Sequence, residues 1–460
     1  MHDLRKKALL ESGKTVSRKA RARPDPPRST LSPGNGSPAS SRPGSRATST
    51  AGSRAGSRVP SEDEASDYEY DDAMTMSSAN SVSGEDVYED DTNKTWPERL
   101  QDRIAELQDR KRSSVQGREA TLKAYVHILK HHFAQKYIEK NISDINAALL
   151  RSIRSGSSDQ ERLLALKALT ATILTCPTET VFDHVFSALK VACENGEEDK
   201  IKVEAITALS IAVTLGGGSS SAAEEVLDFL LEIIESDGQS VGAPDNGSVV
   251  AAALQAWAFV ASYVDDLSVQ SDQAMEAFME QLDSTDSDVQ TGAGVNIALL
   301  FEAARDYEEE TGESSDMQYN QHRIMTRMAE IVRDSSKTVS KSNRKQLKAN
   351  FQSIITSLER GLGPGYSTAG RGAANPHTGG SKLEINAGGE EDFVEFGYRE
   401  KLRIHNQSLI IDTWSLHARV DTLKTVLGGG LATQYIENPV VREVLKGADV
   451  EYIAKTTKRR

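Results

Sequence analysis

The sequence predicts an all-α protein: an armadillo- or HEAT-like α-solenoid of about five to six helix pairs, with a small C-terminal helical module and a disordered N-terminal tail. Three observations lead to this fold class. Helix-type periodicity begins at residue 96, similar apolar segments recur about every forty residues, and residues 1–95 show no apolar period with which to build a core.

The N-terminal tail, residues 1–95, is rich in Ser, Arg, Gly and Pro, and its charges are sorted by sign. Residues 1–60 hold 13 Lys and Arg against 3 acids, whereas residues 61–91 hold 12 acids and no Lys or Arg. The tail is therefore a basic arm followed by an acidic spacer. The arm suits nuclear import or RNA contact, a mitochondrial transit peptide, or simply a solvated tail.

The segment 96–360 carries the repeats. Five stretches share a polar start followed by alternating Ala and large aliphatic residues, and shorter amphipathic runs lie between them. Aligned on equivalent small positions, the stretches are spaced by 44, 40, 48 and 41 residues; those positions are Thr121, Ala165, Ala205, Ala253 and Gly294. Each unit therefore consists of two helices, which is the period of HEAT and armadillo repeats.

Start and stop signals agree with this division. Ser158 with Glu161, and Ser221 with Glu224, have the spacing of a capping box, in which each side chain satisfies an amide at the helix start. Glycines expected in the left-handed conformation follow three helix ends: Gly196, Gly216 and Gly238.

The stretch AAALQAWAFV, residues 251–260, has almost no polar side chain to place in water. A single helix pair cannot bury such a surface, so we expect it to pack against neighbouring repeats. Trp257 and Phe259 are accordingly expected to be core residues rather than a ligand site.

Two further helices, about 316–333 and 340–360, precede a Gly-rich flexible loop at 361–392. The C-terminal module then covers 393–460 and ends in a basic tail. It begins with a possible short hairpin, of which Glu395–Ile404 and Leu409–Ile411 are the strands.

A helix follows the hairpin in the module. Leu416, Val420, Leu423 and Leu427 share one helical face, Asp412 or Thr413 caps the start, and Gly428 ends the helix. A last short helix runs from Asn438–Pro439 to Gly447.

No enzyme constellation is found, and we predict no catalytic residue, metal, cofactor or small-molecule substrate. His127 and His131 are four residues apart but lack a third ligand, and Cys176 and Cys193 have neither disulfide-framework nor metal-site spacing. No apolar run is long enough to span a bilayer, so no membrane contact is expected.

With a net charge of -14, the chain is no uniformly basic nucleic-acid binder, and any such contact needs a local patch. Basic residues gather in 323–348 and at the end of the chain. These candidates for contact with ribosomal RNA or a partner are Arg323, Arg327, Arg333, Lys337, Lys341, Arg344, Lys345, Lys348, Lys455, Lys458, Arg459 and Arg460. Such a cluster also suits a solvated helix face.

Several motifs, in this order, resemble the interferon-related developmental regulator family: ALQAWAFV (253–260), VQTGAGVNIALLFEAARD (289–306), the basic run 333–361, IDTWSLHARVDTLKTVLGGG (411–430) and NPVVREVL (438–445). The resemblance implies an armadillo-type solenoid with a C-terminal module. It also implies a non-enzymatic role, either as a nuclear transcriptional co-regulator or as a factor that occupies inactive ribosomes.

Carried over to this sequence, the family's basic segment matches Lys337, Lys341, Arg344 and Lys345, which the resemblance makes candidates for ribosomal RNA contact. The family's C-terminal module matches Trp414, Leu427 and Gly428, for which it implies structural roles.

Two functional hypotheses result. The favoured one is a ribosome-associated scaffold that represses translation or marks inactive ribosomes and contacts ribosomal RNA through the basic patch and the C-terminal helices. It is favoured because eight basic residues within 323–348 are hard to explain by a peptide groove. The alternative is a nuclear adaptor that binds transcriptional co-regulator proteins in the solenoid groove. Together they predict a location in cytoplasm and nucleus.

Overall fold

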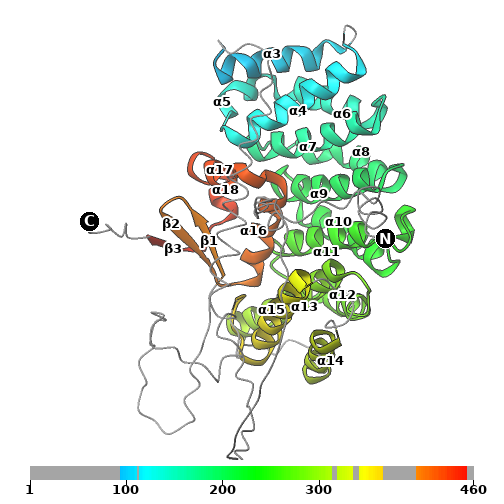
Figure 1. Ribbon diagram of the computed structural model, residues 1–460, viewed down its shortest axis with the longest axis vertical. Helices are drawn as coiled ribbons and strands as arrows, with labels where there is room; N and C mark the ends of the chain where they lie inside the picture. The colour runs from blue at the N-terminus through cyan, green and yellow to red at the C-terminus, as the bar shows by residue number, and fades with distance from the viewer. Residues whose placement is uncertain (1–93, 111–112, 313–318, 335–340, 366–399, 453–460) are drawn as a thin grey trace, which may run out of the picture. The chain divides into compact units, whose positions relative to one another are not determined.

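The computed structural model describes residues 94–110, 113–312, 319–334, 341–365 and 400–452. All of them belong to one compact unit of the chain, Asp63–Arg460. The predicted fold class is confirmed, because this unit is a stack of helix pairs accompanied by one small sheet (Figure 1). The predicted disorder of residues 1–95 concerns a segment that, except for its last two residues, lies outside the described residues.

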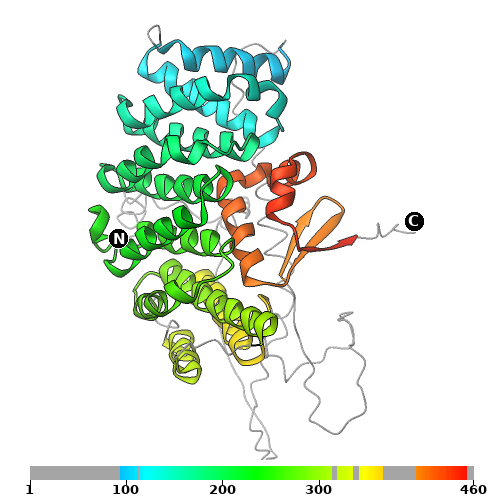
Figure 2. The same cartoon turned by 180° about the vertical axis from the view of Figure 1, so that it is seen from behind.

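The five aligned segments form one layer of helices, called here the inner layer. They are α4 (Val115–His131), α7 (Asp159–Thr175), α9 (Asp199–Leu215), α11 (Gly247–Ala261) and α13 (Ser287–Thr311). Each packs against the next in this order, as Figures 1 and 2 show from opposite sides. The forty-residue period therefore sets the lateral stacking of this layer.

The shorter amphipathic runs form the outer layer, in which each helix packs on its inner-layer partner. Its members are α3 (Trp96–Gln108), α6 (Ile142–Ser155), α8 (Val181–Asn195), α10 (Ser220–Glu235) and α12 (Ser268–Gln281). Short helical turns lie between layers at α5 (Gln135–Ile138), η4 (Glu139–Asn141) and η5 (Gln239–Val241). The stack ends with α14 (Gln321–Asp334) and α15 (Lys341–Arg360), which pack together, and α15 also contacts α13.

The two layers differ in how much of each helix is buried. Outer helix α8 buries one stripe, with Val181, Val185 and Leu189 spaced four residues apart. Inner helix α9 instead buries every residue from Ala205 to Val213. A helix that is apolar on all sides needs cover on both faces, so the inner layer requires a second cover besides the outer helices.

The side chains of Trp257 and Phe259 lie fully inside the core. The Trp257 ring meets Phe278 of α12 edge-on, with ring centroids 4.9 Å apart. Small residues let other helices approach closely: a Cβ added at Gly294 would lie 2.9 Å from the Cδ1 atom of Ile354 in α15. Gly294, the small residue of α13 on which the repeats were aligned, is therefore the point at which α15 packs against α13.

The C-terminal module contains three strands and three α-helices. In chain order its elements are β1 (Glu400–Ile404), β2 (Gln407–Ile411), α16 (Trp414–Leu427), η6 (Gly428–Gly430), α17 (Leu431–Glu437), α18 (Pro439–Val444) and β3 (Asp449–Tyr452). The strands form an antiparallel sheet of order β1-β2-β3, in which Leu409 pairs with Leu402 on one side and Val450 on the other. The sequence predicted neither α17 nor β3.

One predicted capping box is half formed and the other is wrong. Ser158 does accept a hydrogen bond from the Glu161 amide, at 3.0 Å, but the Glu161 carboxylate accepts from the Ser157 amide and not from that of Ser158. Helix α10, however, is capped by Ser219, whose hydroxyl accepts from the Ala222 amide at 3.2 Å. Any of the three consecutive serines, 219 to 221, could cap a helix with its hydroxyl. The first of them is the N-cap, so Ser221 lies inside the helix.

The three glycines predicted to follow helix ends do so, but not all of them adopt the predicted left-handed conformation. Gly196 and Gly216 cap α8 and α9 with φ of -61° and -100°, which any residue adopts. The left-handed conformation is found at Gly238, as predicted, and at Gly217, where a Cβ would also collide with the Glu179 backbone.

Replacing Trp257 by Ala should lower the free energy of unfolding by about 3–5 kcal/mol, because it leaves a large cavity under α12. Urea denaturation followed by helical circular dichroism measures this change. Val269→Ala is the control: this side chain is 84% exposed, and its loss should change stability by less than about 0.5 kcal/mol. Equal effects of the two substitutions would show that the inner layer is not the stabilising core.

Candidate functional site

The second face of the inner layer is covered by the C-terminal module of the same chain. Helix α16 packs against α7, α11 and α13, α17 packs against α4, and α18 packs against α7. Figures 1 and 2 show these helices beside the middle of the stack, with the sheet farther out. This contact region, called here the seam, lies where a groove-binding partner would have to enter.

One end of the seam is fixed by Glu302, a buried residue of α13. Its carboxylate accepts hydrogen bonds from the backbone amides of Trp414 and Ser415, at 2.7 and 2.9 Å. These amides open α16, where an anion is favoured by unsatisfied N–H groups and the helix dipole. Burial raises the pKa of Glu302, which the two amides oppose. The Trp414 indole also donates to Ser357 in α15, at 2.7 Å, so this residue joins three helices.

The middle of the seam joins α16 to α11. The Gln255 amide donates to the carboxylate of Asp421, at 2.7 Å, and to the hydroxyl of Thr425, at 3.0 Å. The Arg419 guanidinium donates to the carbonyl and hydroxyl oxygens of Ser262, the residue that caps α11. It also stacks 4.2 Å from the centre of the Tyr263 ring.

At the other end of the seam, side-chain amides of the module meet the carboxyl ends of two inner helices. Gln434 donates to the Leu129 carbonyl of α4, at 2.7 Å, and Asn438 donates to the Leu174 carbonyl of α7, at 3.0 Å. Gly430 lies against the backbone of Lys130, where an added Cβ would be 2.2 Å from the carbonyl oxygen. Only glycine permits this approach of the module to α4.

A charged cluster attaches the sheet to α16. His417 lies 2.6 Å from a carboxylate oxygen of Glu400 in β1, and Lys424 lies 3.7 Å from the other. Burial disfavours the charged form of both Glu400 and His417. The positive charges of His417 and Lys424 outweigh the effect of burial on Glu400 and lower the pKa of its carboxyl to about 2. The Glu400 carboxylate likewise raises the pKa of His417 against the effect of burial.

Apart from Trp414, the polar residues of the seam were missed by sequence reasoning. Their signal was polar side chains within apolar runs, notably Gln255 in AAALQAWAFV and Glu302 in ALLFEAA. A polar side chain in an apolar run is expected to have a hydrogen-bond partner, but the sequence does not show which distant residue that partner is.

The structure places only part of the predicted basic set. Arg323 is exposed on α14, and Lys348 is exposed on the adjacent helix α15. Neither forms an ion pair with another described residue. Arg327, in contrast, is paired with Asp283 and with Glu330.

The remaining basic candidates are less completely placed. Arg333 is exposed near the end of α14, and Lys341, Arg344 and Lys345 belong to the first turns of α15. Five candidates lie outside the described residues: Lys337, Lys455, Lys458, Arg459 and Arg460.

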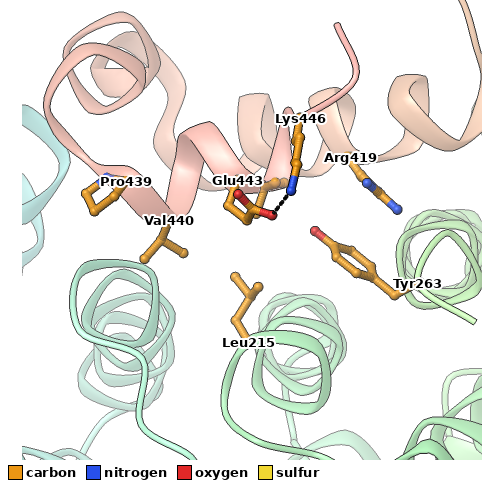
Figure 3. A pocket seen from close by; sticks show the side chains of 8 residues that line it. Leu215, Tyr263, Arg419, Pro439, Val440, Glu443 and Lys446 are labelled. Carbon is orange, nitrogen blue, oxygen red and sulfur yellow. Dashed lines mark hydrogen bonds and ion pairs between the residues drawn. The ribbon is translucent and has the colours of Figure 1, made fainter.

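An open pocket of about 640 Å³ interrupts the seam beside the end of α9 (Figure 3). Its apolar wall consists of Leu215, Pro439, Val440 and Val444, together with the ring of Tyr263. Burial raises the pKa of the Tyr263 hydroxyl to about 12. Arg419, Glu443 and Lys446 form the polar rim.

The described ranges contain neither a cluster suited to bind a metal ion nor a helix suited to span a membrane. No cluster of three or more His, Cys, Asp or Glu side chains there is suited to hold a metal. The rings of His127 and His131 lie 4.3 Å apart, and burial raises the pKa of both thiols, Cys176 and Cys193. No helix within these ranges combines the length and apolar character needed to cross a bilayer.

The His417–Glu400 pair should make docking of the sheet depend on pH. Because the folded-state pKa of His417 lies above its ordinary value of 6.5, its stabilising charge is fully present below pH 6.5 and is lost as pH rises through the raised pKa. Urea denaturation at pH 6–9 should therefore show falling stability across this window. His417→Gln should remove that part of the slope, and NMR titration of the imidazole in Glu400→Gln should show a lower pKa than in the parent.

Comparison with known proteins identifies a family and several similar sequences. The family model described as interferon-related developmental regulator (IFRD) matches residues 70–359. Among similar proteins, an uncharacterised protein of Schizosaccharomyces pombe is 26% identical, over 77% of this chain and 75% of its own length. An engineered protein of known structure aligns over 56% of this chain and 97% of its own, at 15% identity, but its TM-score of 0.35 is too low to support any argument.

Other similar proteins carry the family name. Interferon-related developmental regulator 1 of Sus scrofa is 21% identical, over 75% of this chain and 71% of its own length. Interferon-related developmental regulator 2 of Mus musculus is 24% identical, over 63% of this chain and 54% of its own length. The family model alone matches more than half of the sequence, so this chain belongs to the interferon-related developmental regulator family.

Proposed function

We propose that this protein is a non-enzymatic scaffold that associates with the ribosome and represses translation or marks inactive ribosomes. In this proposal the basic residues of α14 and α15 contact ribosomal RNA. The observation that carries the proposal is the juxtaposition of exposed cations on two packed helices of a chain whose net charge is -14. Local basic surface on an acidic protein suits a partner that is itself a strong polyanion.

Arg323 and Lys348 carry this argument among the described side chains. Both are exposed, and within the described ranges neither is neutralised by a carboxylate. Each phosphate that such a cation contacts releases condensed counterions, which gives affinity without reading sequence. Arg327 is less available, because phosphate contact would compete with its pairs to Asp283 and Glu330.

The alternative function is a nuclear adaptor that binds transcriptional co-regulators in the solenoid groove. Coverage of the inner layer by α16, α17 and α18 argues against that mode, because a peptide would first have to displace the seam. An adaptor partner would need a different surface. The ribosomal proposal is therefore favoured, with action in the cytoplasm and a nuclear role as the second candidate.

The names of the relatives support regulation as the general role. Two of them are called developmental regulators, and neither name states a substrate or a reaction. A regulatory scaffold requires binding surfaces rather than catalytic groups, which suits a chain that exposes Arg323 and Lys348 on two adjacent helices.

Sedimentation tests the association directly. Lysate is separated on sucrose gradients at about 50 mM and about 200 mM salt, and the protein is expected with ribosomal fractions at low salt and largely free of them at high salt. RNase treatment that dissociates ribosomes should shift the protein with them. Absence from ribosomal fractions at low salt would contradict the proposal.

Charge reversal tests the contact. The double variant Arg323→Glu/Lys348→Glu should weaken binding to purified ribosomes and reduce the slope of log affinity against log salt by about two, one for each lost phosphate contact. The triple variant Lys341→Glu/Arg344→Glu/Lys345→Glu should reduce it further if those residues contribute. Helicity should be unchanged in both.

The matched control is Lys140→Glu/Lys200→Glu, which makes the same charge change at two exposed lysines outside α14 and α15. It should leave the salt slope near the parent value. If the control and the α14–α15 variant behaved alike, net charge rather than the basic surface would govern binding.

A further inference from the structure

A single kind of contact recurs along the seam. At three inner-layer helices, a side chain of the C-terminal module donates hydrogen bonds to backbone carbonyls of the final turn or the cap. Gln434 serves α4, Asn438 serves α7 and Arg419 serves α11. The last four carbonyls of a helix have no partner within the helix, so these donors satisfy acceptors that would otherwise be left unpaired.

The intervening helix, α9, does not receive such a donor. It lies between α7 and α11 in the inner layer and ends at Leu215. Its cap is partly satisfied from the outer layer, because the Phe182 amide donates to the Gly216 carbonyl at 2.9 Å. Within the described ranges, however, no module side chain donates to the carbonyls of Thr214 or Leu215.

The 640 Å³ pocket lies at this end of α9. Figure 3 shows Leu215 pointing into it from α9, with Val440 and Pro439 of α18 facing Leu215 across the opening. The Tyr263 hydroxyl also points inward, and it has no hydrogen-bond partner among the described residues. The pocket therefore combines apolar walls with one unpaired hydroxyl, and it lies beside the end of α9, whose last carbonyls receive no donor from a described side chain of the module.

The charged side chains around the pocket already have other contacts. Lys446 lies 3.0 Å from Glu443, and the Arg419 guanidinium, which forms no ion pair with another described residue, donates to Ser262 and lies over the Tyr263 ring. A charged group entering the pocket would lose hydration and would have to compete with these contacts, which disfavours it. A neutral group with both a donor and an acceptor is the better match.

We propose that this pocket binds a neutral carboxamide, an Asn or Gln side chain presented by a partner polypeptide. The amide N–H groups donate to the open carbonyls at the end of α9, and the carbonyl oxygen accepts from the Tyr263 hydroxyl. The aliphatic part of the side chain packs on Leu215 and Val440. The partner residue thereby completes the row in which Gln434 and Asn438 already supply carboxamides to α4 and α7.

This site is independent of the basic residues of α14 and α15, so it can be tested without ribosomes. The probes are four blocked amino acids, the N-acetyl N-methylamides of Gln, Glu, Lys and norleucine. Methyl NMR of the full-length protein follows the signals of Leu215, Val440 and Val444 as each probe is added. The Gln probe should bind about threefold to tenfold more tightly than norleucine, as expected for one or two neutral hydrogen bonds, and more tightly than either charged probe.

A pocket-filling variant gives the control. Val440→Trp should abolish the shifts caused by the Gln probe while the unfolding midpoint stays near the parent value. Val191→Trp makes the same substitution at a half-exposed position of α8 and should leave binding intact. The proposal is overturned if the Gln probe causes no shifts at its solubility limit, if Glu, Lys or norleucine binds equally well, or if Val440→Trp retains the response in a folded protein.

Discussion

The structure depends on one constraint: the helices of the inner layer are apolar on more than one face. Ala205 to Val213 of α9 are buried without interruption, and α7 shows the same pattern from Ala168 to Thr175. Outer helices cover one side of such a helix, and something else must cover the other. For α4, α7, α11 and α13 the second cover is the C-terminal module, which therefore completes the core of the solenoid.

The need for a second cover explains the chemistry of the seam. Apolar burial alone would fix the module loosely, whereas buried polar groups must find particular partners. Glu302 at the start of α16 and Gln434 at the end of α4 each satisfy groups that burial would otherwise leave unpaired, and Gln255 adds a more exposed contact to Asp421. These contacts set the position of the module along the stack. At the pocket beside α9, no described side chain of the module donates a hydrogen bond to the end of the helix.

The repeat fold could be predicted because its signals are local. A helix pair with its caps fits within forty residues, so self-similarity and periodicity expose it, and the small position at Gly294 marks a close helix contact. The seam could not be predicted, because each contact joins residues far apart in the sequence: 112 positions separate Trp414 from Glu302, and 305 separate Gln434 from Leu129. Strand β3 escaped notice because Asp449–Tyr452 is only four residues long and exposed throughout, and because its pairing with β2 joins residues about 40 positions apart in the sequence. The basic candidates were visible from composition, but the pairing of Arg327 was not, since Asp283 belongs to a different helix pair.

The distance between Leu129 and Gln434 has a consequence for biosynthesis. At about 5–20 residues per second, the 305 intervening positions take roughly 15–60 s to translate. Throughout that interval the emerging repeats have their outer helices but not the segment that shields their other side. Nascent chains of this protein should therefore expose an apolar surface to chaperones until α16 to α18 leave the exit tunnel, and premature termination upstream of α16 would leave that surface permanently bare.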